Sequence, residues 1–232
     1  MTLDEFQTQN SLSFSNKLVL EQAFIHRSYI NENPKSSLYH NERLEFLGDA
    51  VLELIVTEYL YTKYPNHNEG DLTAYRSALV NAVTLGDVAS SLGCNDLIKL
   101  SKGEAKDVHR ARSSILADAY EAIIGAIYLD QGYNTTHNFV ARTLLIKTEE
   151  IIRKGLYKDA KSFVQEKSQE VYNLTPTYKV EGEEGPDHDK LFNVAIFFGD
   201  QKVANGGGKS KQEAETQAAR NALAAKGWAS LS

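Results

Sequence analysis

The sequence predicts two domains, a larger and mostly α-helical domain followed by a small α+β domain. The chain has 232 residues, more than a typical single domain of roughly 100–150 residues. Before residue 155 apolar residues recur at spacings of three and four, as at Leu44, Leu47 and Val51, which is typical of helices. After residue 155 a spacing of two appears, which is typical of strands. We therefore expect the domain boundary near residue 155.

The helical part contains a series of segments with apolar residues at helical spacing. They are marked by these apolar groups: Leu20, Ala23 and Phe24; Leu44, Leu47 and Val51; and Ala119, Ile123 and Ile127.

The residues after 155 are predicted to form a helix, then strands, then a second helix. A helical stretch begins at Asp159 and has to end before Pro176, because proline disfavours helical geometry at the residue before it. Residues 192–198 alternate along a strand, Gly199 opens a turn, and residues 202–205 form a second extended run, so a hairpin is expected. Helical spacing returns over residues 210–226.

Composition excludes some classes of protein. The chain is 42% hydrophobic and 24% charged, and no apolar run approaches the ~20 residues needed to cross a bilayer, so we expect no membrane segment. Residues 1–5 have neither the basic start nor the apolar stretch of a signal peptide, and the single Cys94 cannot form an intrachain disulfide. We therefore expect a cytoplasmic protein.

The net charge of −6 argues against nucleic acid as a partner, because phosphate binding usually leaves a basic footprint. Residues 155–232 are nearly neutral, with ten basic and eleven acidic side chains, so the excess of acids lies in the first domain. A local feature of the first domain is therefore expected to account for part of this charge.

One cause is a stripe of acids in residues 41–56. At 100° per residue, one narrow helix face carries Glu42, Glu45, Asp49 and Glu53. The other faces are almost entirely apolar, which indicates a buried helix in which stacked carboxylates repel one another and lose hydration. Such an arrangement needs a cation. The alternative is an ordinary solvated face that points to water.

A second apolar segment, residues 113–129, weakens that alternative. Its carboxylates Asp118 and Glu121 share one face, and no polar side is left to meet water. Gly48 and Gly125 each cost roughly 1 kcal/mol inside a helix, a cost that close helix packing usually offsets. Two helices packed at these glycines would form an all-oxygen site, which suits Mg²⁺ or Mn²⁺. The histidine spacings and the lone cysteine do not fit a zinc site.

A carboxylate site for Mg²⁺ usually serves phosphoryl chemistry. Residues 41–52 (NERLEFLGDAVL) and 115–130 (ILADAYEAIIGAIYLD), together with residues 68–72 and 100–104, closely resemble bacterial ribonuclease III. Residues 159–226 resemble the double-stranded RNA-binding domain of that family. The resemblance implies a mostly α-helical nuclease domain over residues 1–154 and a small α-β-β-β-α RNA-binding domain over residues 158–228.

The resemblance also implies an activity. The protein would be a Mg²⁺-dependent endoribonuclease for double-stranded RNA, with Mn²⁺ as a substitute and no organic cofactor. Cleavage would leave 5′-phosphate and 3′-hydroxyl ends with short 3′ overhangs, in the maturation of rRNA and mRNA. The family works as a homodimer in which each subunit cuts one strand.

Individual residues carry over from the family motifs. Four match the metal-binding and catalytic acids: Glu45, Asp49, Asp118 and Glu121. Of these, Asp49 and Glu121 rank first. Glu42 and Glu69 match two further acids implicated in cleavage, whereas Glu53 lies outside the family set and is expected to be solvated.

Phe46 matches an aromatic residue that enters a pocket of the partner subunit. The alternative interpretation is that Phe46 is an ordinary buried residue of the hydrophobic core.

The RNA contacts are also implied residue by residue. Three residues resemble readers of the minor groove: Gln165, Glu166 and His188. Lys209 and Lys211, at the start of the last helix, resemble phosphate contacts. Gln212 stands where the family commonly has another lysine, and Ala160 replaces a common proline. Residues 107–109 depart from the small residues usual in the nuclease loop, where four basic side chains remain available for phosphates: Lys102, Lys106, Arg110 and Arg112.

Two other functions compete with the nuclease. One is a binding protein that kept the fold and lost cleavage, acting as an RNA chaperone or a structural subunit. The other is a metal-dependent phosphatase for small molecules, a function that does not explain the second domain. The presence of all four acids favours the nuclease.

Overall fold

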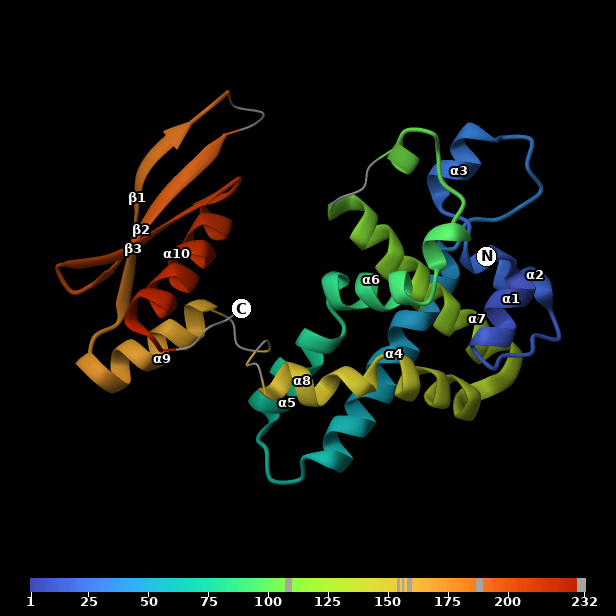
Figure 1. The fold of residues 1–232 in the computed structure, drawn as a ribbon, viewed down its shortest axis with the longest axis horizontal. Helices are drawn as coiled ribbons and strands as arrows, with labels where there is room; N and C mark the ends of the chain where they lie inside the picture. The colour runs from blue at the N-terminus through green and yellow to red at the C-terminus, as the bar shows by residue number, and fades with distance from the viewer. Residues whose placement is uncertain (107–109, 154, 156, 158–159, 187–189, 229–232) are drawn as a thin grey trace. The chain divides into compact units, whose positions relative to one another are not determined.

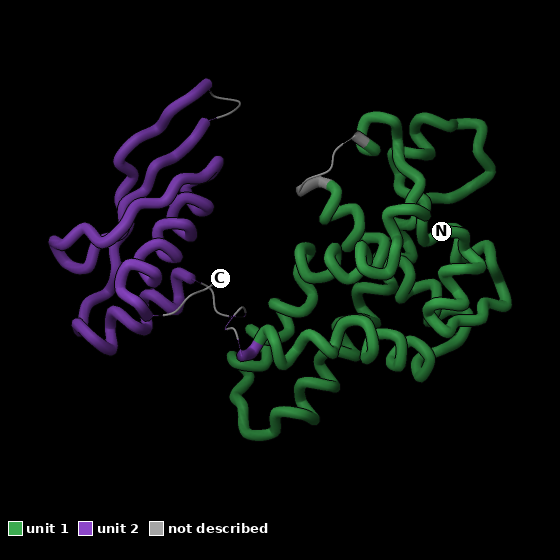
Figure 2. Tube along the Cα trace, viewed as in Figure 1, with its two compact units in different colours: residues 1–151 green, residues 152–232 purple. Residues whose placement is uncertain are grey.

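The computed structural model describes residues 1–106, 110–153, 155, 157, 160–186 and 190–228. The chain divides into two compact units, residues 1–151 and residues 152–232 (Figure 2). Among the described residues, no helix is both long enough and apolar enough to cross a membrane. The expected boundary at residue 155 lies close to this division.

Unit 1 is helical, as its apolar spacing predicts (Figure 1). Its α-helices are α1 (Leu3–Gln9), α2 (Lys17–Ala23), α3 (Arg27–Glu32), α4 (Glu42–Lys63), α5 (Glu69–Leu79), α6 (Ala82–Ser91), α7 (Arg110–Thr143) and α8 (Thr148–Arg153). Short 3-10 turns are η1 (Cys94–Asp96), η2 (Glu104–Lys106) and η3 (Leu145–Lys147).

Helices α4 and α7 pack closely against each other at two glycines. A Cβ atom placed on Gly48 would lie 1.8 Å from the carbonyl oxygen of Glu121, and one on Gly125 would lie 2.2 Å from the carbonyl oxygen of Leu44. Both distances are far below van der Waals contact, so only glycine permits this approach. The predicted packing of the two helices at their glycines is confirmed.

Helix α7 is longer than residues 113–129, and it contains a sharp bend. The backbone of Gly132 has φ 76° and ψ −179°, which interrupts the helical geometry and divides α7 into two segments. The Tyr120 and Phe139 rings, one from each segment, lie 6.0 Å apart, and the Tyr120 hydroxyl lies 2.7 Å from Thr143 Oγ1. The second segment therefore packs back against the buried part of the first.

Unit 2 has the order helix, three strands, helix (Figure 1). Its elements are α9 (Ala160–Tyr172), β1 (Pro176–Glu184), β2 (Leu191–Phe198), β3 (Gln201–Gly208) and α10 (Lys211–Lys226). The strands form an antiparallel sheet in the order β1-β2-β3. Phe163 of α9, Ile196 of β2 and Leu223 of α10 belong to one core, so both helices cover the same face of the sheet. The predicted hairpin and fold class are confirmed, whereas Asp159 lies outside the described residues.

The glycine contact generates a prediction about stability. In Gly48→Ala the added Cβ meets backbone atoms of α7, which cannot rotate away. We expect a loss of about 3 kcal/mol or more, the upper range for overpacking, and a melting temperature lower by roughly 6–12 °C. Gly103→Ala is the control, because its Cβ would meet only Ser101 Oγ at 3.8 Å. Equal melting temperatures for the two variants would contradict the close packing.

Candidate functional site

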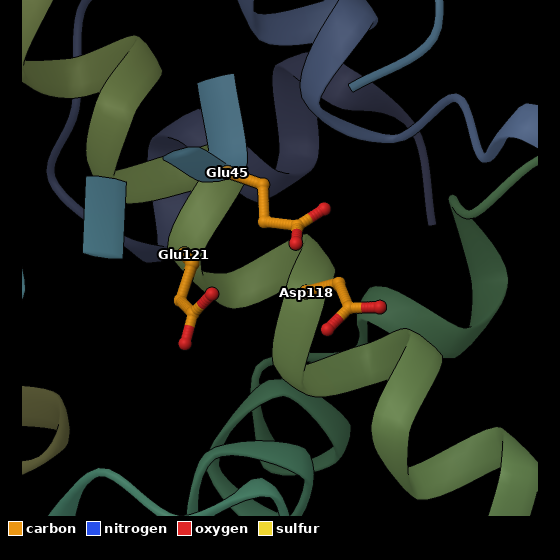
Figure 3. Close-up of side chains that lie close together, drawn as sticks. All are labelled: Glu45, Asp118 and Glu121. Carbon is orange, nitrogen blue, oxygen red and sulfur yellow. The ribbon is translucent and has the colours of Figure 1, made fainter. Parts of the chain in front are cut away.

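Three carboxylates from two helices converge at the contact between α4 and α7 (Figure 3). Glu45 lies in the first turn of α4, and Asp118 and Glu121 lie one turn apart on α7. Each offers an oxygen atom within 4.8 Å of the oxygens offered by the other two. All three side chains are half-buried. The structure therefore assembles an acidic cluster, defined as Glu45, Asp118 and Glu121.

The surroundings of the acidic cluster disfavour negative charge. Burial raises the pKa of Glu121 to about 8, and repulsion from neighbouring carboxylates, first of all Asp49, adds to the effect. Burial also raises the pKa of Glu45, with repulsion from Asp118 contributing. Burial raises the pKa of Asp118, and the nearby His26 opposes that shift.

The cluster has the properties expected of a cation site. Within the described part of the chain, none of its three carboxylates forms an ion pair with a lysine or an arginine. The donors are all carboxylate oxygens, the ligands that Mg²⁺ and Mn²⁺ prefer. A divalent cation would offset the repulsion between these acids, so the residues present fit such an ion.

The other predicted acids lie outside the cluster. Asp49 is exposed one turn after Glu45, close enough for its charge to raise the pKa values of Glu45 and Glu121. Glu53 is exposed, as expected.

Glu42 is exposed at the start of α4 and is paired with basic groups. One of its carboxylate oxygens lies 3.3 Å from the Arg27 guanidinium, and the other lies 3.6 Å from His40 Nδ1. Glu69 is the first residue of α5 and is also exposed. These ion pairs could not be foreseen, because they join α4 to side chains from other parts of the chain.

Phe46 is not a core residue, since its side chain is 81% exposed. The core alternative is therefore wrong. Leu54 and Tyr61 are also exposed and follow at spacings of eight and seven, which places all three on one face of α4. We call this face the α4 stripe, defined as Phe46, Leu54 and Tyr61.

A cavity of about 460 Å³ lies between α4 and α5, at the end of the α4 stripe. It is lined by Thr57, Leu60, Tyr61, His67, Glu69, Leu72, Thr73 and Arg76. Arg76 donates a hydrogen bond to Thr57 Oγ1 at 3.0 Å across the two helices. No sequence motif predicts this cavity, because its walls come from two helices and the connection between them.

The predicted RNA-contacting residues of unit 2 are exposed where they are described. Gln165 and Glu166 lie on α9, in a shallow hollow that also includes Gln169. Lys209 and Lys211 flank Ser210, whose side chain caps α10 by accepting a hydrogen bond from the Glu213 backbone N–H. His188 lies outside the described residues.

The basic side chains of the nuclease loop differ in their surroundings. Lys102 is exposed. Arg112 donates hydrogen bonds to the side chain and to the carbonyl oxygen of Asn95, at 2.9 and 3.3 Å. The side chains of Lys106 and Arg110 lie outside the described residues.

Comparisons with known proteins agree with this arrangement. The Ribonuclease-III-like family matches residues 16–148, and the double-stranded RNA binding motif matches residues 160–226. Ribonuclease 3 of Borreliella burgdorferi is 45% identical over 224 residues, covering 96% of this chain and 91% of the relative. Ribonuclease 3 of Desulforamulus reducens is 41% identical over 220 residues, covering 95% and 89%.

A solved structure is similar to the first unit. It is the nuclease domain of ribonuclease III from Campylobacter jejuni, with 40% sequence identity and a TM-score of 0.56. The match covers 63% of this chain and 96% of the Campylobacter jejuni chain. That nuclease domain shows structural flexibility in a region involved in dimer formation. The helical unit with its acidic cluster, joined to an RNA-binding motif, thus defines a nuclease of the double-stranded RNA class. The chain belongs to the ribonuclease III family.

The raised pKa of Glu121 generates a prediction about stability and pH. Without metal, folded Glu121 keeps its proton up to about pH 8, whereas the unfolded chain releases it near the ordinary value of 4.5. Between these values the folded state binds more protons, so the free energy of unfolding falls as pH rises. Glu121→Gln removes this titration. In EDTA we expect the variant to melt a few degrees above the wild type near pH 8, with a smaller gap near pH 5.

Addition of Mg²⁺ should raise the melting temperature of the wild type more than that of the variant, because a ligand of the folded state stabilises it. Differential scanning fluorimetry measures both effects. A gap that is the same at both pH values, or a wild type that does not respond to Mg²⁺, would count against the cluster as a cation site.

Proposed function

We propose that this protein is a Mg²⁺-dependent endoribonuclease that hydrolyses phosphodiester bonds of double-stranded RNA. The observation that carries the proposal is the acidic cluster, in which three half-buried carboxylates converge without a lysine or arginine partner among the described residues. The RNA-binding motif over residues 160–226 supports double-stranded RNA as the substrate. Mn²⁺ would serve as a substitute, because it takes the same hard oxygen ligands.

The acids have distinct proposed roles. Glu45, Asp118 and Glu121 would hold the cation, and Asp49 would complete the set from the next turn of α4. A cation held there would supply an activated water and would neutralise charge on the phosphate oxygens. Glu42 forms an ion pair with Arg27, which supports a role outside the ligand set.

The products follow from hydrolysis on the 3′-oxygen side of the phosphate. The water oxygen attacks phosphorus, and the bond to the 3′-oxygen breaks. The phosphate stays on the 5′ end and the proton goes to the 3′-hydroxyl. One cut in each strand by two staggered centres would leave short 3′ overhangs. We assign the reaction to the maturation of rRNA and mRNA, as the resemblance to bacterial ribonuclease III implies.

Two centres require two subunits, and the α4 stripe supports a homodimer. An aromatic side chain that is 81% exposed beside an acidic cluster costs solvation free energy, and burial against another protein surface removes that cost. The cavity between α4 and α5 lies on the same side of α4 and is large enough for a phenylalanine ring. We therefore propose that Phe46 of each subunit is buried by the other.

Substitution of Glu121 tests the activity. Glu121→Gln keeps the side-chain volume and removes the charge, so we expect cleavage of a long RNA duplex in Mg²⁺ to fall by at least about 100-fold. Binding of the duplex should persist, because recognition is assigned to unit 2. Glu53→Gln is the matched control, since Glu53 is exposed on α4 outside the cluster and also raises the pKa of Glu121. It should cut at close to the wild-type rate.

Parallel cleavage and gel-shift assays separate the competing functions. If Glu121→Gln cuts as fast as the wild type, Glu121 is not a catalytic ligand. A wild type that binds the duplex but never cuts it in Mg²⁺ or Mn²⁺ would instead be a non-catalytic RNA chaperone or structural subunit.

The dimer generates its own prediction. We expect light scattering at micromolar concentration to give twice the 25.8 kDa of one chain for the wild type. Phe46→Asp should shift the mass toward the monomer, because it places a charge in a buried apolar contact. Leu18→Asp is the control, as Leu18 is 71% exposed on α2 and does not belong to the α4 stripe. A monomeric wild type, or a dimeric Phe46→Asp protein, would refute the proposed interface.

A further inference from the structure

Glu183 at the end of β1 contacts two lysines at once. Its carboxylate oxygens lie 3.3 Å from Lys190 Nζ and 3.7 Å from Lys211 Nζ. Lys190 directly precedes β2, and Lys211 is the first residue of α10. The Lys211 ammonium also lies 5.7 Å from the centre of the Phe192 ring. We call this group the Glu183 clamp, defined as Glu183, Lys190 and Lys211.

The Glu183 clamp occupies groups that a phosphate would use. Lys211 stands at the N-terminus of α10, where the partial positive charge of the helix adds to the ammonium charge. Glu183 places a carboxylate against the Lys190 and Lys211 ammonium groups, and its negative charge repels any approaching phosphate. Two lysines and one acid thus present a net charge of only +1 toward a polyanion.

The pairs of the Glu183 clamp are weak enough to exchange. All three side chains are between about one third and three fifths exposed. Ion pairs with this much solvent contact contribute little, because water screens the charges, so a phosphate can displace the carboxylate.

We propose that Glu183 is an internal counter-ion that lowers the affinity of unit 2 for duplex RNA, because a phosphate has to displace it from Lys190 and Lys211. This inference rests on the proposed function, in which unit 2 binds the substrate. Under this inference an acidic residue, Glu183, helps to set the affinity of unit 2 for RNA, on a surface where basic residues are expected. In the opposite role, the Glu183 carboxylate orients the two lysines for binding. Loss of the carboxylate would then weaken binding of the duplex.

Substitution of Glu183 distinguishes the two roles. Glu183→Gln in the full-length chain keeps the shape of the side chain and removes the negative charge that pairs with Lys190 and Lys211. Affinity is measured by fluorescence anisotropy with an RNA duplex of about 20 base pairs, longer than the ~16 base pairs that such a domain spans, in EDTA so that no cleavage occurs. We expect binding roughly three- to tenfold tighter than that of the wild type.

Glu184→Gln is the matched control. Glu184 is the next residue of β1, is exposed, and makes no ion pair with the described residues. It changes the net charge by the same amount, so its effect measures the general loss of repulsion, which we expect to be less than about twofold. The excess of Glu183→Gln over Glu184→Gln then reports the release of the lysines.

A second pair of variants tests the link to Lys211. Lys211→Gln should cost more affinity in the Glu183→Gln protein than in the wild type, because Lys211 is then no longer held by the carboxylate. Circular dichroism confirms that each variant is folded.

Three results would overturn the proposal: Glu183→Gln that binds no tighter than the wild type, Glu183→Gln that binds no tighter than Glu184→Gln, or equal costs of Lys211→Gln in both backgrounds. In each case a wild type that binds the duplex leaves the proposed function standing. A wild type and a Glu183→Gln protein that both fail to bind the duplex would refute the role of unit 2 as well.

Discussion

The contact between α4 and α7 at Gly48 and Gly125 is the constraint on which the acidic cluster depends. Because the backbones meet where a Cβ would lie 1.8 Å from the Glu121 carbonyl oxygen, the side chains on either side of the contact are brought together. Glu45 from one helix and Asp118 and Glu121 from the other cannot move apart without separating the two helices. Burial by this packing is the largest cause of their raised pKa values, and repulsion between carboxylates adds to it at Glu45 and Glu121. A divalent cation would offset that repulsion.

Much of this centre could be predicted from the sequence, since the carboxylates and the glycines lie at helical spacings within two short segments. The stripe on α4 and the pair on α7 follow from 100° per residue, and apolar residues on the other faces indicate burial. Features that depend on distant parts of the chain could not be predicted in this way. The pairing of Glu42 with Arg27 and the bend at Gly132 each depend on tertiary packing.

The nearly neutral charge of residues 155–232 has a structural counterpart in unit 2. Its lysines are not simply exposed cations, because several are paired within the unit, as Lys202 is with Glu181 and Lys211 with Glu183. Recognition of a duplex by such a surface depends on position rather than on net charge, which agrees with reading the shape of A-form RNA. The net charge of −6 is compatible with nucleic-acid binding, because net charge does not show where the individual charges lie.

The central claim is that the contact between α4 and α7 creates a cation site. The most direct measurement is an anomalous diffraction map from crystals of the full-length protein grown in Mn²⁺. We expect a peak bounded by carboxylate oxygens of Glu45, Asp118 and Glu121, and we expect its loss in Glu121→Gln crystals grown in the same way. Absence of a peak at these residues in the wild type, or a peak that persists unchanged in the variant, would contradict the central claim.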